Sequence, residues 1–329
     1  MKRFLFLLAL GVALPAAAEP LKIRHGYVSF DNSLSPMVFK KPDVLRHYGT
    51  SYTVDPIHFA GTSMEVTALA AGEADIISCG FSTIAAAILN AHMDDIRILA
   101  DGFQDGVEGY FSTTYLVRKD SAFAKVEDLK GKVMAVNAIG GALDVALRAM
   151  LRQHGLEDRR DYSVVEAEFA PMVPMLLEGK VDLIGEVPRF VLDPLVQAKA
   201  RTLFTERDAV GPTQQIFLAA RADFLAKNRA ALLDFFEDEI RGLHWFLDPA
   251  NREAAIGLIA AAMRTPVERY SAYLFTKQDF YRDPNARPNI AALQHDMQTQ
   301  LSLGFIKSPI EIAKYADLSF VEEAAGRAK

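Results

Sequence analysis

Cysteine is almost absent from this chain of 329 residues, and long apolar runs and low-complexity tracts are missing. With Cys79 as its single cysteine, the chain forms no intramolecular disulfide, so its stability must come from a large hydrophobic core, which its length allows. No segment reaches the roughly 18 apolar residues of a membrane-spanning helix. Positive charge is also scarce: 36 Lys and Arg against 42 Asp and Glu give a net charge of −6, which argues against a nucleic-acid partner.

The sequence motifs of catalysis and cofactor binding are missing as well. There is no G-x-G-x-x-G fingerprint, P-loop, H-E-x-x-H or G-x-S-x-G elbow, and the seven histidines are scattered. We therefore predict no cofactor, no metal ion and no catalytic residue. Cys79 lies among apolar neighbours and is predicted to be a buried structural thiol.

The N-terminus has the pattern of a secretory signal peptide. Lys2 and Arg3 precede an apolar run over residues 4–14, and small residues follow up to Ala18. As a helix this run spans only about 16 Å, too short for a hydrocarbon core of about 30 Å, so a signal peptide is favoured over a membrane anchor or a buried first helix. Cleavage near Ala18 predicts export to the periplasm and lowers the net charge from −6 to −8.

Short β-rich runs alternate with helical stretches from residue 21 onward, which predicts an α/β fold with mainly parallel sheets. Helices are expected over 36–47, 63–71 and 83–91, with Thr62 or Ser63 capping one helix and Ser82 another. We predict two lobes, with a polar stretch over 119–132 and a strand over 214–220 carrying the chain from one lobe to the other. The remainder is predicted to be helical, with a long helix over 223–246, and to cover the first sheet.

We accordingly expect a signal peptide at 1–18, a discontinuous first lobe over 19–118 and 218–329, and a second lobe over 119–217. Ligands of open α/β sheets bind where strand ends lead into helix N-termini. Four loops with small, hydrogen-bonding residues occupy such places, at 29–33, 60–63, 80–83 and 137–141. Their backbone N–H groups and hydroxyls suit an anionic or polar ligand oxygen. Taken singly, Thr62, Ser63 and Ser82 could equally be ordinary caps.

Three segments resemble one protein family. Residues 61–76 read GTSMEVTALAAGEADI, residues 128–137 read DLKGKVMAVN, and residues 177–182 read LEGKVD. In this order and spacing they resemble the periplasmic solute-binding proteins of ABC importers, in the branch that takes nitrate, sulfonates, taurine and thiamine precursors. The resemblance extends over nearly the whole chain after the signal peptide.

The resemblance implies a two-lobed type II periplasmic binding protein with a ligand cleft between its lobes. It further implies capture of a small organic anion, of sulfonate or carboxylate type, and delivery to the membrane permease subunits, with no nucleic-acid partner and a monomeric chain. The ligand-binding residues that it implies are Phe30, Asp31, Gly61, Thr62, Ser63, Phe81, Ser82, Asn137, Gly140, Gly141, Ala142, Glu186 and Arg189.

One feature departs from the family pattern, and two others leave alternatives open. The segment 138–142 lacks the hydroxyl that the family often has, so it offers only backbone donors. Arg189 either pairs with an acidic ligand or is a solvated charge. The phenylalanines at strand ends fit an aromatic or apolar ligand body or core packing: Phe30, Phe59, Phe81 and Phe103.

Two other functions share the implied fold. One is an enzyme that forms a pyrimidine precursor or acts as a dehydratase. The pyrimidine-forming relatives carry a cysteine-rich iron-binding stretch, which Cys79 alone does not supply, and the exported N-terminus disfavours a cytoplasmic enzyme. The other is a periplasmic ligand sensor, which the sequence does not distinguish from a transport component.

Overall fold

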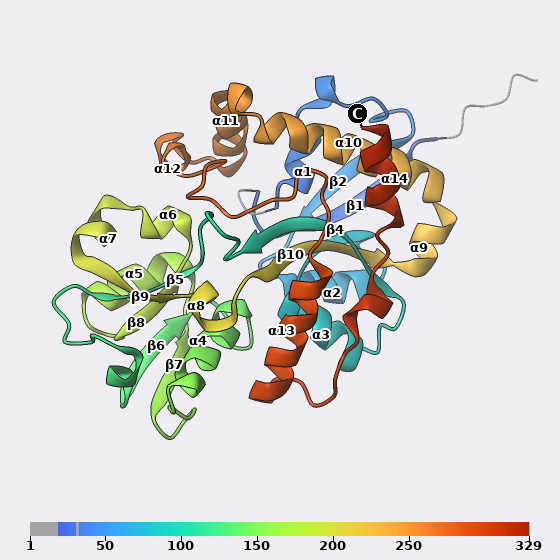
Figure 1. Cartoon of the computed structure of the whole chain (residues 1–329). Helices are drawn as coiled ribbons and strands as arrows, with labels where there is room; N and C mark the ends of the chain where they lie inside the picture. The colour runs from blue at the N-terminus through green and yellow to red at the C-terminus, as the bar shows by residue number, and fades with distance from the viewer. Residues whose placement is uncertain (1–18, 31–32, 329) are drawn as a thin grey trace, which may run out of the picture.

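The computed structural model describes residues 19–30 and 33–328, so the predicted signal peptide at 1–18 lies outside the described residues. Two five-stranded sheets stand side by side, each covered by helices (Figure 1). We call each sheet with its helices a lobe. The first sheet has the order β2-β1-β3-β10-β4, with β1 Leu21–Tyr27, β2 Tyr52–His58, β3 Ile76–Gly80, β4 Ile96–Asp105 and β10 Thr213–Arg221. The second has the order β7-β6-β8-β5-β9, with β5 Thr114–Arg118, β6 Lys132–Val136, β7 Tyr162–Glu166, β8 Leu183–Glu186 and β9 Ala200–Thr205.

Both sheets follow one pattern of strand directions. In the first sheet β2, β1 and β3 are parallel, and β10 pairs antiparallel with both β3 and β4. In the second sheet β7, β6 and β8 are parallel, and β5 pairs antiparallel with β8 and β9. The antiparallel strand of each sheet is the one that arrives from the other lobe. The predicted α/β fold with mainly parallel sheets is therefore confirmed, with one reversed strand in each sheet.

Helices from distant parts of the chain cover the first sheet. The first-lobe helices are α1 Ser35–Val38, α2 Thr62–Ala70, α3 Phe81–Leu89, α9 Ala222–Lys227, α10 Arg229–Leu247, α11 Arg252–Met263, α12 Glu268–Ser271, α13 Ile290–Leu303 and α14 Ser319–Arg327. One apolar core includes side chains of α1, α10, α11 and α14, and a second includes side chains of α2, α3 and α13. As predicted, the C-terminal helices complete this lobe. No helix in the described ranges is both long and apolar enough to cross a membrane.

The second sheet is covered by helices from a single stretch of chain. They are α4 Ala142–Gln153, α5 Phe169–Leu177, α6 Pro188–Val191, α7 Pro194–Lys199 and α8 Glu206–Val210. Short 3-10 turns complete the fold at η1 Pro42–Val44, η2 Val126–Leu129, η3 Pro249–Asn251 and η4 Ile312–Tyr315. The buried side chains of this lobe form two further clusters.

Equivalent aspartates connect neighbouring strands in the two sheets. Asp75 precedes β3, and its Oδ2 accepts a hydrogen bond of 2.9 Å from the N–H of Arg24 in β1. Asp182 precedes β8, and its Oδ2 accepts one of 3.0 Å from the N–H of Val133 in β6. Each carboxylate thereby fixes the start of one strand against the next.

Three predicted elements differ from the structure. The helix expected over 36–47 is reduced to α1 and the turn η1, because Pro42 lacks the N–H that a continuing helix needs. The long helix expected from 223 is divided at Asn228 into α9 and α10. The crossings expected near 119 and 218 also differ in position, since the chain is already in the second sheet at Thr114 and in the first at Thr213. The residue boundaries of the lobes stay a prediction.

The two lobes contact each other in several places. Helix α13 of the first lobe packs against α4 of the second, and Val145 of α4 belongs to a first-lobe core. Arg269 of α12 lies 3.7 Å from Asp193, which caps α7. Figure 1 shows these helices facing each other across the junction between the lobes.

Candidate functional site

Three helices that follow strand ends begin at glycine. Gly61 caps α2, Gly80 caps α3 and Gly141 caps α4, and no side-chain oxygen caps α2 or α4. The predicted capping by Ser63, Thr62 and Ser82 is therefore wrong, because each helix begins one or two residues earlier. In α3 it is the Thr83 hydroxyl that accepts the Gly80 N–H, at 3.0 Å. A glycine cap leaves first-turn N–H groups to water or to a ligand.

The loop before α4 uses some of the donors that the sequence offered to a ligand. The Gly140 N–H donates to Asp144 Oδ2 at 2.9 Å, and the Ile139 N–H donates to Glu166 Oε2 at 2.8 Å. Gly140 has φ +77°, which favours glycine. The structure therefore directs the Gly140 amide inward, and the N-terminus of α4 at Ala142 is the part of this loop that keeps uncapped donors.

Asn137 and Glu186 stand at equivalent positions in the second sheet. The last parallel pair is Ala135–Ile184, and Asn137 and Glu186 each come two residues after it, at the carboxyl ends of β6 and β8. Asn137 Oδ1 and both carboxyl oxygens of Glu186 are buried and have no hydrogen-bond partner among the described residues. Buried polar atoms are normally paired, so these three oxygens point to a binding role.

Glu186 is fully buried, and this determines its charge. Burial raises the pKa of Glu186 to about 9, opposed in part by the adjacent Val187 N–H, which is too poorly placed for a hydrogen bond, and by the Arg189 guanidinium. At neutral pH the carboxyl is thus protonated and can donate one hydrogen bond while accepting another. Arg189 is half-buried, and its guanidinium carbon lies 4.9 Å from the centroid of the Phe190 ring.

An aromatic cluster joins the two lobes beside Glu186. Phe103 of β4 stacks on Phe280 with centroids 4.5 Å apart, and Phe111 meets Phe280 edge-on at 5.4 Å. Val187 belongs to the same cluster, and further side chains pack against it: Phe111, Phe169, Phe190 and Ile216. Sequence reasoning found Phe103 and missed the others, because Phe111, Phe169 and Phe280 are far apart in the chain and carry no motif.

The remaining predicted residues of the first lobe take different places. Phe30 is buried and stacks on Tyr27 at 4.1 Å, and Phe81 lies in the core that also contacts Ala142. Ser82 is half-buried, Thr62 is half-buried and Ser63 is exposed. The carbonyls of Gly61 and Ser63 accept hydrogen bonds from residues of α2 itself, the former from the N–H groups of Met64 and Glu65 and the latter from the Thr67 hydroxyl. Asp31 lies outside the described residues.

Cys79 is a fully buried thiol, as predicted. Its Sγ lies 3.4 Å from the Thr83 hydroxyl, and burial raises the pKa of the thiol to about 12. A thiol with this pKa is not a nucleophile at neutral pH, because the thiolate is the reactive form.

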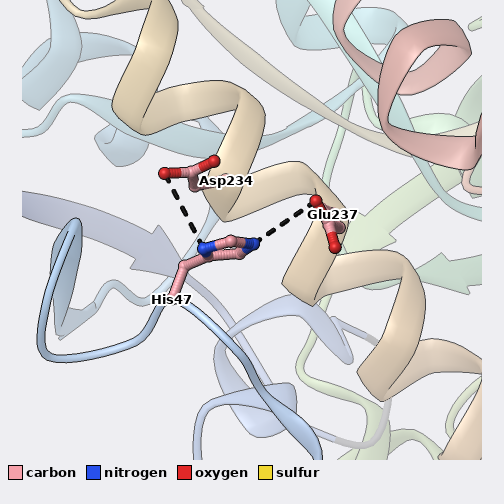
Figure 2. A group of neighbouring side chains, drawn as sticks. All are labelled: His47, Asp234 and Glu237. Atoms are coloured by element: carbon pink, nitrogen blue, oxygen red, sulfur yellow. Dashed lines mark ion pairs between the residues drawn. The ribbon is translucent and has the colours of Figure 1, made fainter. Parts of the chain in front are cut away.

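His47, Asp234 and Glu237 form a group with the side-chain chemistry of a metal site (Figure 2). The ring nitrogens face different carboxylates: Nδ1 lies 3.9 Å from Asp234 Oδ2 and Nε2 lies 3.3 Å from Glu237 Oε2. A metal ion bound to one ring nitrogen would therefore have the second carboxylate on the far side of the imidazole. This arrangement suits an imidazole held between two carboxylates better than three ligands around one ion.

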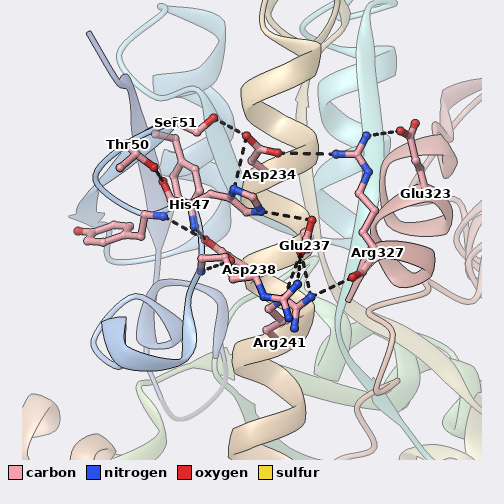
Figure 3. A network of polar contacts seen from close by, with 12 residues as sticks. His47, Thr50, Ser51, Asp234, Glu237, Asp238, Arg241, Glu323 and Arg327 are labelled. Atoms are coloured by element: carbon pink, nitrogen blue, oxygen red, sulfur yellow. Dashed lines mark hydrogen bonds and ion pairs between the residues drawn. The ribbon is translucent and has the colours of Figure 1, made fainter. Parts of the chain in front are cut away.

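Arginines already neutralise these carboxylates (Figure 3). Arg241 donates to Glu237 Oε1 at 3.0 and 3.2 Å, and Arg327 lies 3.7 Å from Asp234. Asp238 accepts the N–H groups of Arg46, His47 and Tyr48 and the Tyr52 hydroxyl. We therefore assign the group to a structural network that fixes the segment 46–52 on α10 and α14.

The fold has many counterparts among solved structures. The aliphatic sulphonate binding protein SsuA from Escherichia coli is 21% identical, with a TM-score of 0.69 over 90% of this chain and 92% of that chain. The nitrate-binding protein NrtA from Synechocystis is 16% identical, with a TM-score of 0.74 over 95% of this chain and 90% of that chain. The desulfurization enzyme DSZB is 14% identical, with a TM-score of 0.67 over 94% of this chain and 100% of that chain.

These likenesses show the two-lobed fold of type II periplasmic binding proteins, which the sequence predicted. No curated protein matches the chain. The sequence model of the NMT1-like family matches residues 16–260, which is most of the chain. The protein belongs to the NMT1-like family.

Proposed function

We propose that this protein is the periplasmic substrate-binding component of an ABC importer and that it captures a small organic anion between its lobes. One observation carries the proposal: Asn137 and Glu186 stand at equivalent positions at the carboxyl ends of the neighbouring strands β6 and β8, with buried oxygens that no described residue pairs. The glycine-capped helix α4 begins in the loop that follows Asn137 and adds uncapped N–H donors and a helix dipole.

The ligand chemistry follows from these groups. A protonated Glu186 can donate its O–H to an anionic oxygen, so a buried carboxyl is compatible with a carboxylate or sulfonate ligand. The phenylalanines beside Val187 supply an apolar surface for an aromatic or alkyl body. SsuA and NrtA, which share the fold, are described as binding sulfonates and nitrate. We extend ligand binding of this kind, periplasmic export and delivery to permease subunits to this chain.

A catalytic function is the alternative, since DSZB has the same fold. The buried, weakly acidic thiol of Cys79 supports binding over nucleophilic catalysis. We therefore expect bound ligand to be recovered chemically unchanged.

The proposal is tested by thermal unfolding of the ligand-free protein with nitrate, taurine, alkanesulfonates and aromatic carboxylates. A true ligand at a hundredfold excess over Kd adds about 2.7 kcal/mol to the free energy of unfolding. Gly141→Val should abolish this stabilisation, because its Cβ would lie 3.0 Å from the Ala138 carbonyl oxygen at the start of α4. Ser63→Ala should also abolish the stabilisation by ligand, because Ser63 belongs to the first-lobe loop of the predicted site.

Glu186 provides the sharper comparison. Glu186→Ala removes the donor and should lose the ligand stabilisation, whereas Glu186→Gln keeps the size and a donor and should retain most of it. Glu178→Gln is the matched control, since Glu178 is an exposed second-lobe carboxylate paired with Lys180. Full stabilisation of Glu186→Ala, or turnover of the ligand, contradicts the proposal.

A further inference from the structure

Three buried carboxyl groups are linked through β10 where the chain crosses between the lobes: Thr213 pairs with Asp105 and donates to Glu206, and the N–H of Gln214 donates to Asp296. Asp105 is the last residue of β4, Glu206 is the first residue of α8, and Asp296 lies on α13. Asp105 and Glu206 are 0% exposed and Asp296 is 2% exposed. Asp105 and Asp296 belong to the first lobe, while Glu206 directly follows the second-lobe strand β9. The cluster therefore contains groups from both lobes.

Within the described part of the chain, the hydrogen bonds to these carboxyls come from hydroxyl and amide groups. Asp105 accepts the Ser112 hydroxyl at 2.6 Å and the Thr113 N–H at 2.8 Å. Glu206 Oε1 accepts the Thr213 hydroxyl at 3.1 Å, and its Oε2 is buried with no partner among the described residues. The Gln214 N–H lies 3.4 Å from Asp296 Oδ2. A buried carboxyl oxygen without a donor lacks the solvation that an ionised carboxylate needs, which favours the neutral form of Glu206.

The other charged groups of the packed elements do not neutralise the cluster. On α8 itself, Arg207 and Asp208 are exposed, and on β5 the Tyr115 hydroxyl donates to the Leu143 carbonyl. The charged groups of α4 are used elsewhere: Asp144 pairs with Arg148, and Arg152 donates to Ser302. Burial, reinforced by the neighbouring acids, raises the pKa of Glu206 and of Asp296, and burial raises that of Asp105 to about 6.

Both crossings pass this cluster through glycine residues with positive φ. Gly106 follows Asp105 and has φ +68°, and Gly211 precedes Thr213 and has φ +75°. The Ser112 hydroxyl also accepts the Arg207 N–H at 3.0 Å, so one serine connects Asp105 to the start of α8. Domain hinges take up rotation at a few flexible positions, and Gly106 and Gly211 are suited to this role. A rotation of the lobes about these glycines would change the position of Glu206 relative to Asp105 and Asp296.

We propose that Asp105, Glu206 and Asp296 form a proton-controlled latch that holds the lobes together while the carboxyls share protons and lets them separate when the protons leave. In the arrangement described here, ionisation places like charges together away from water. Separation of the lobes admits water and relieves this repulsion. Because the contacting arrangement binds protons more strongly, it is favoured at low pH and weakens as pH rises above the ordinary carboxyl range. The latch does not depend on the identity of the ligand.

Amide hydrogen exchange of the ligand-free protein between about pH 5 and about pH 8 tests the latch, with rates corrected for intrinsic exchange. The reporters are the N–H groups of Thr113, Gln214 and Glu206, which donate to Asp105, Asp296 and the Thr113 carbonyl. We expect their opening constant to rise with pH, by up to about tenfold per pH unit for each proton released. The radius of gyration from X-ray scattering should rise over the same range if the lobes separate.

Glu206→Gln removes one ionisable group at nearly constant shape and should flatten both pH dependences. Asp296→Asn serves if that variant does not fold. Glu65→Gln is the control, because Glu65 is a buried first-lobe carboxyl whose partner is the Ser78 N–H of β3, away from the crossings. A wild-type protein without pH-dependent opening overturns the proposal, and so does a Glu206→Gln variant that follows the wild type.

Discussion

The Ser35 hydroxyl lies 2.8 Å from Nε2 of His25 and also 2.8 Å from Oε2 of Glu239. Nδ1 of His25 lies 2.9 Å from the Gly26 carbonyl oxygen, which accepts hydrogen bonds only, so Nδ1 carries the proton of a neutral ring. Nε2 then accepts from Ser35, and Glu239 must be the donor to Ser35. Consistently, burial lowers the pKa of His25 to about 4 and raises that of Glu239 to about 8.

Ser35→Ala should destabilise the protein by about 1–3 kcal/mol, because it leaves His25 Nε2 and Glu239 Oε2 buried without a partner. Urea unfolding at neutral pH measures the change. Ser271→Ala removes a hydroxyl that bonds to the Val267 carbonyl on an exposed turn and should change stability by at most about 0.5 kcal/mol. Equal effects of the two substitutions would contradict the hydrogen-bonded series of neutral groups from His25 through Ser35 to Glu239.

Glu239→Gln should remove part of the alkaline loss of stability. The pKa of Glu239 is raised on folding, from 4.5 to about 8, so the native state holds a proton that the unfolded chain releases, and stability falls as pH rises through that interval. The amide can still donate to Ser35 but does not ionise. The free energy of unfolding should fall between about pH 5 and about pH 8.5 in both proteins, but less in the variant. The two decreases should differ by a few kcal/mol, since each unit of pKa shift corresponds to about 1.4 kcal/mol. Parallel pH curves would show that Glu239 is not the buried acid.

Asp238→Ala should loosen the segment that precedes β2. Its carboxylate accepts three backbone N–H groups from residues 46–48 and the Tyr52 hydroxyl (Figure 3). Losing these acceptors should cost about 2–4 kcal/mol. Asp234→Ala changes a residue one helical turn earlier in α10. It loses the Ser51 hydroxyl and two ion pairs of 3.7 and 3.9 Å, and it should cost about 1 kcal/mol or less. Thermal unfolding of both variants checks the order, and a reversed order would contradict it.

Two glycines inside helices should respond oppositely to alanine. A Cβ at Gly242 in α10 would overlap Cγ1 of Val38 in α1, so Gly242→Ala should cost about 1–3 kcal/mol. A Cβ at Gly257 in α11 meets nothing within 4 Å, so Gly257→Ala should add about 0.5–1 kcal/mol through helix propensity. Chemical denaturation measures both, and stabilisation by Gly242→Ala would show that α1 does not pack as described.

Local patterns were sufficient to locate the strands, because alternation and buried runs depend on neighbours in sequence. The family resemblance also singled out Asn137 and Glu186, where the structure has unpaired buried oxygens. Local patterns were less reliable at helix starts. Thr62, Ser63 and Ser82 have capping side chains, yet the glycines before them take the cap positions, because α2 already begins at Thr62 and α3 begins directly after β3 at Phe81.

The sequence by itself determined the α/β class, the order of strands and helices, the resemblance to two-lobed binding proteins and the buried state of Cys79. Only the tertiary structure decided which distant groups meet: Phe103 with Phe280 beside Glu186, and Asp105 with Glu206 and Asp296 at the crossings. The physical reason is the distance along the chain over which each kind of interaction acts. Propensity and periodicity act within one element, whereas desolvation, stacking and charge repulsion depend on groups that only the folded chain brings together.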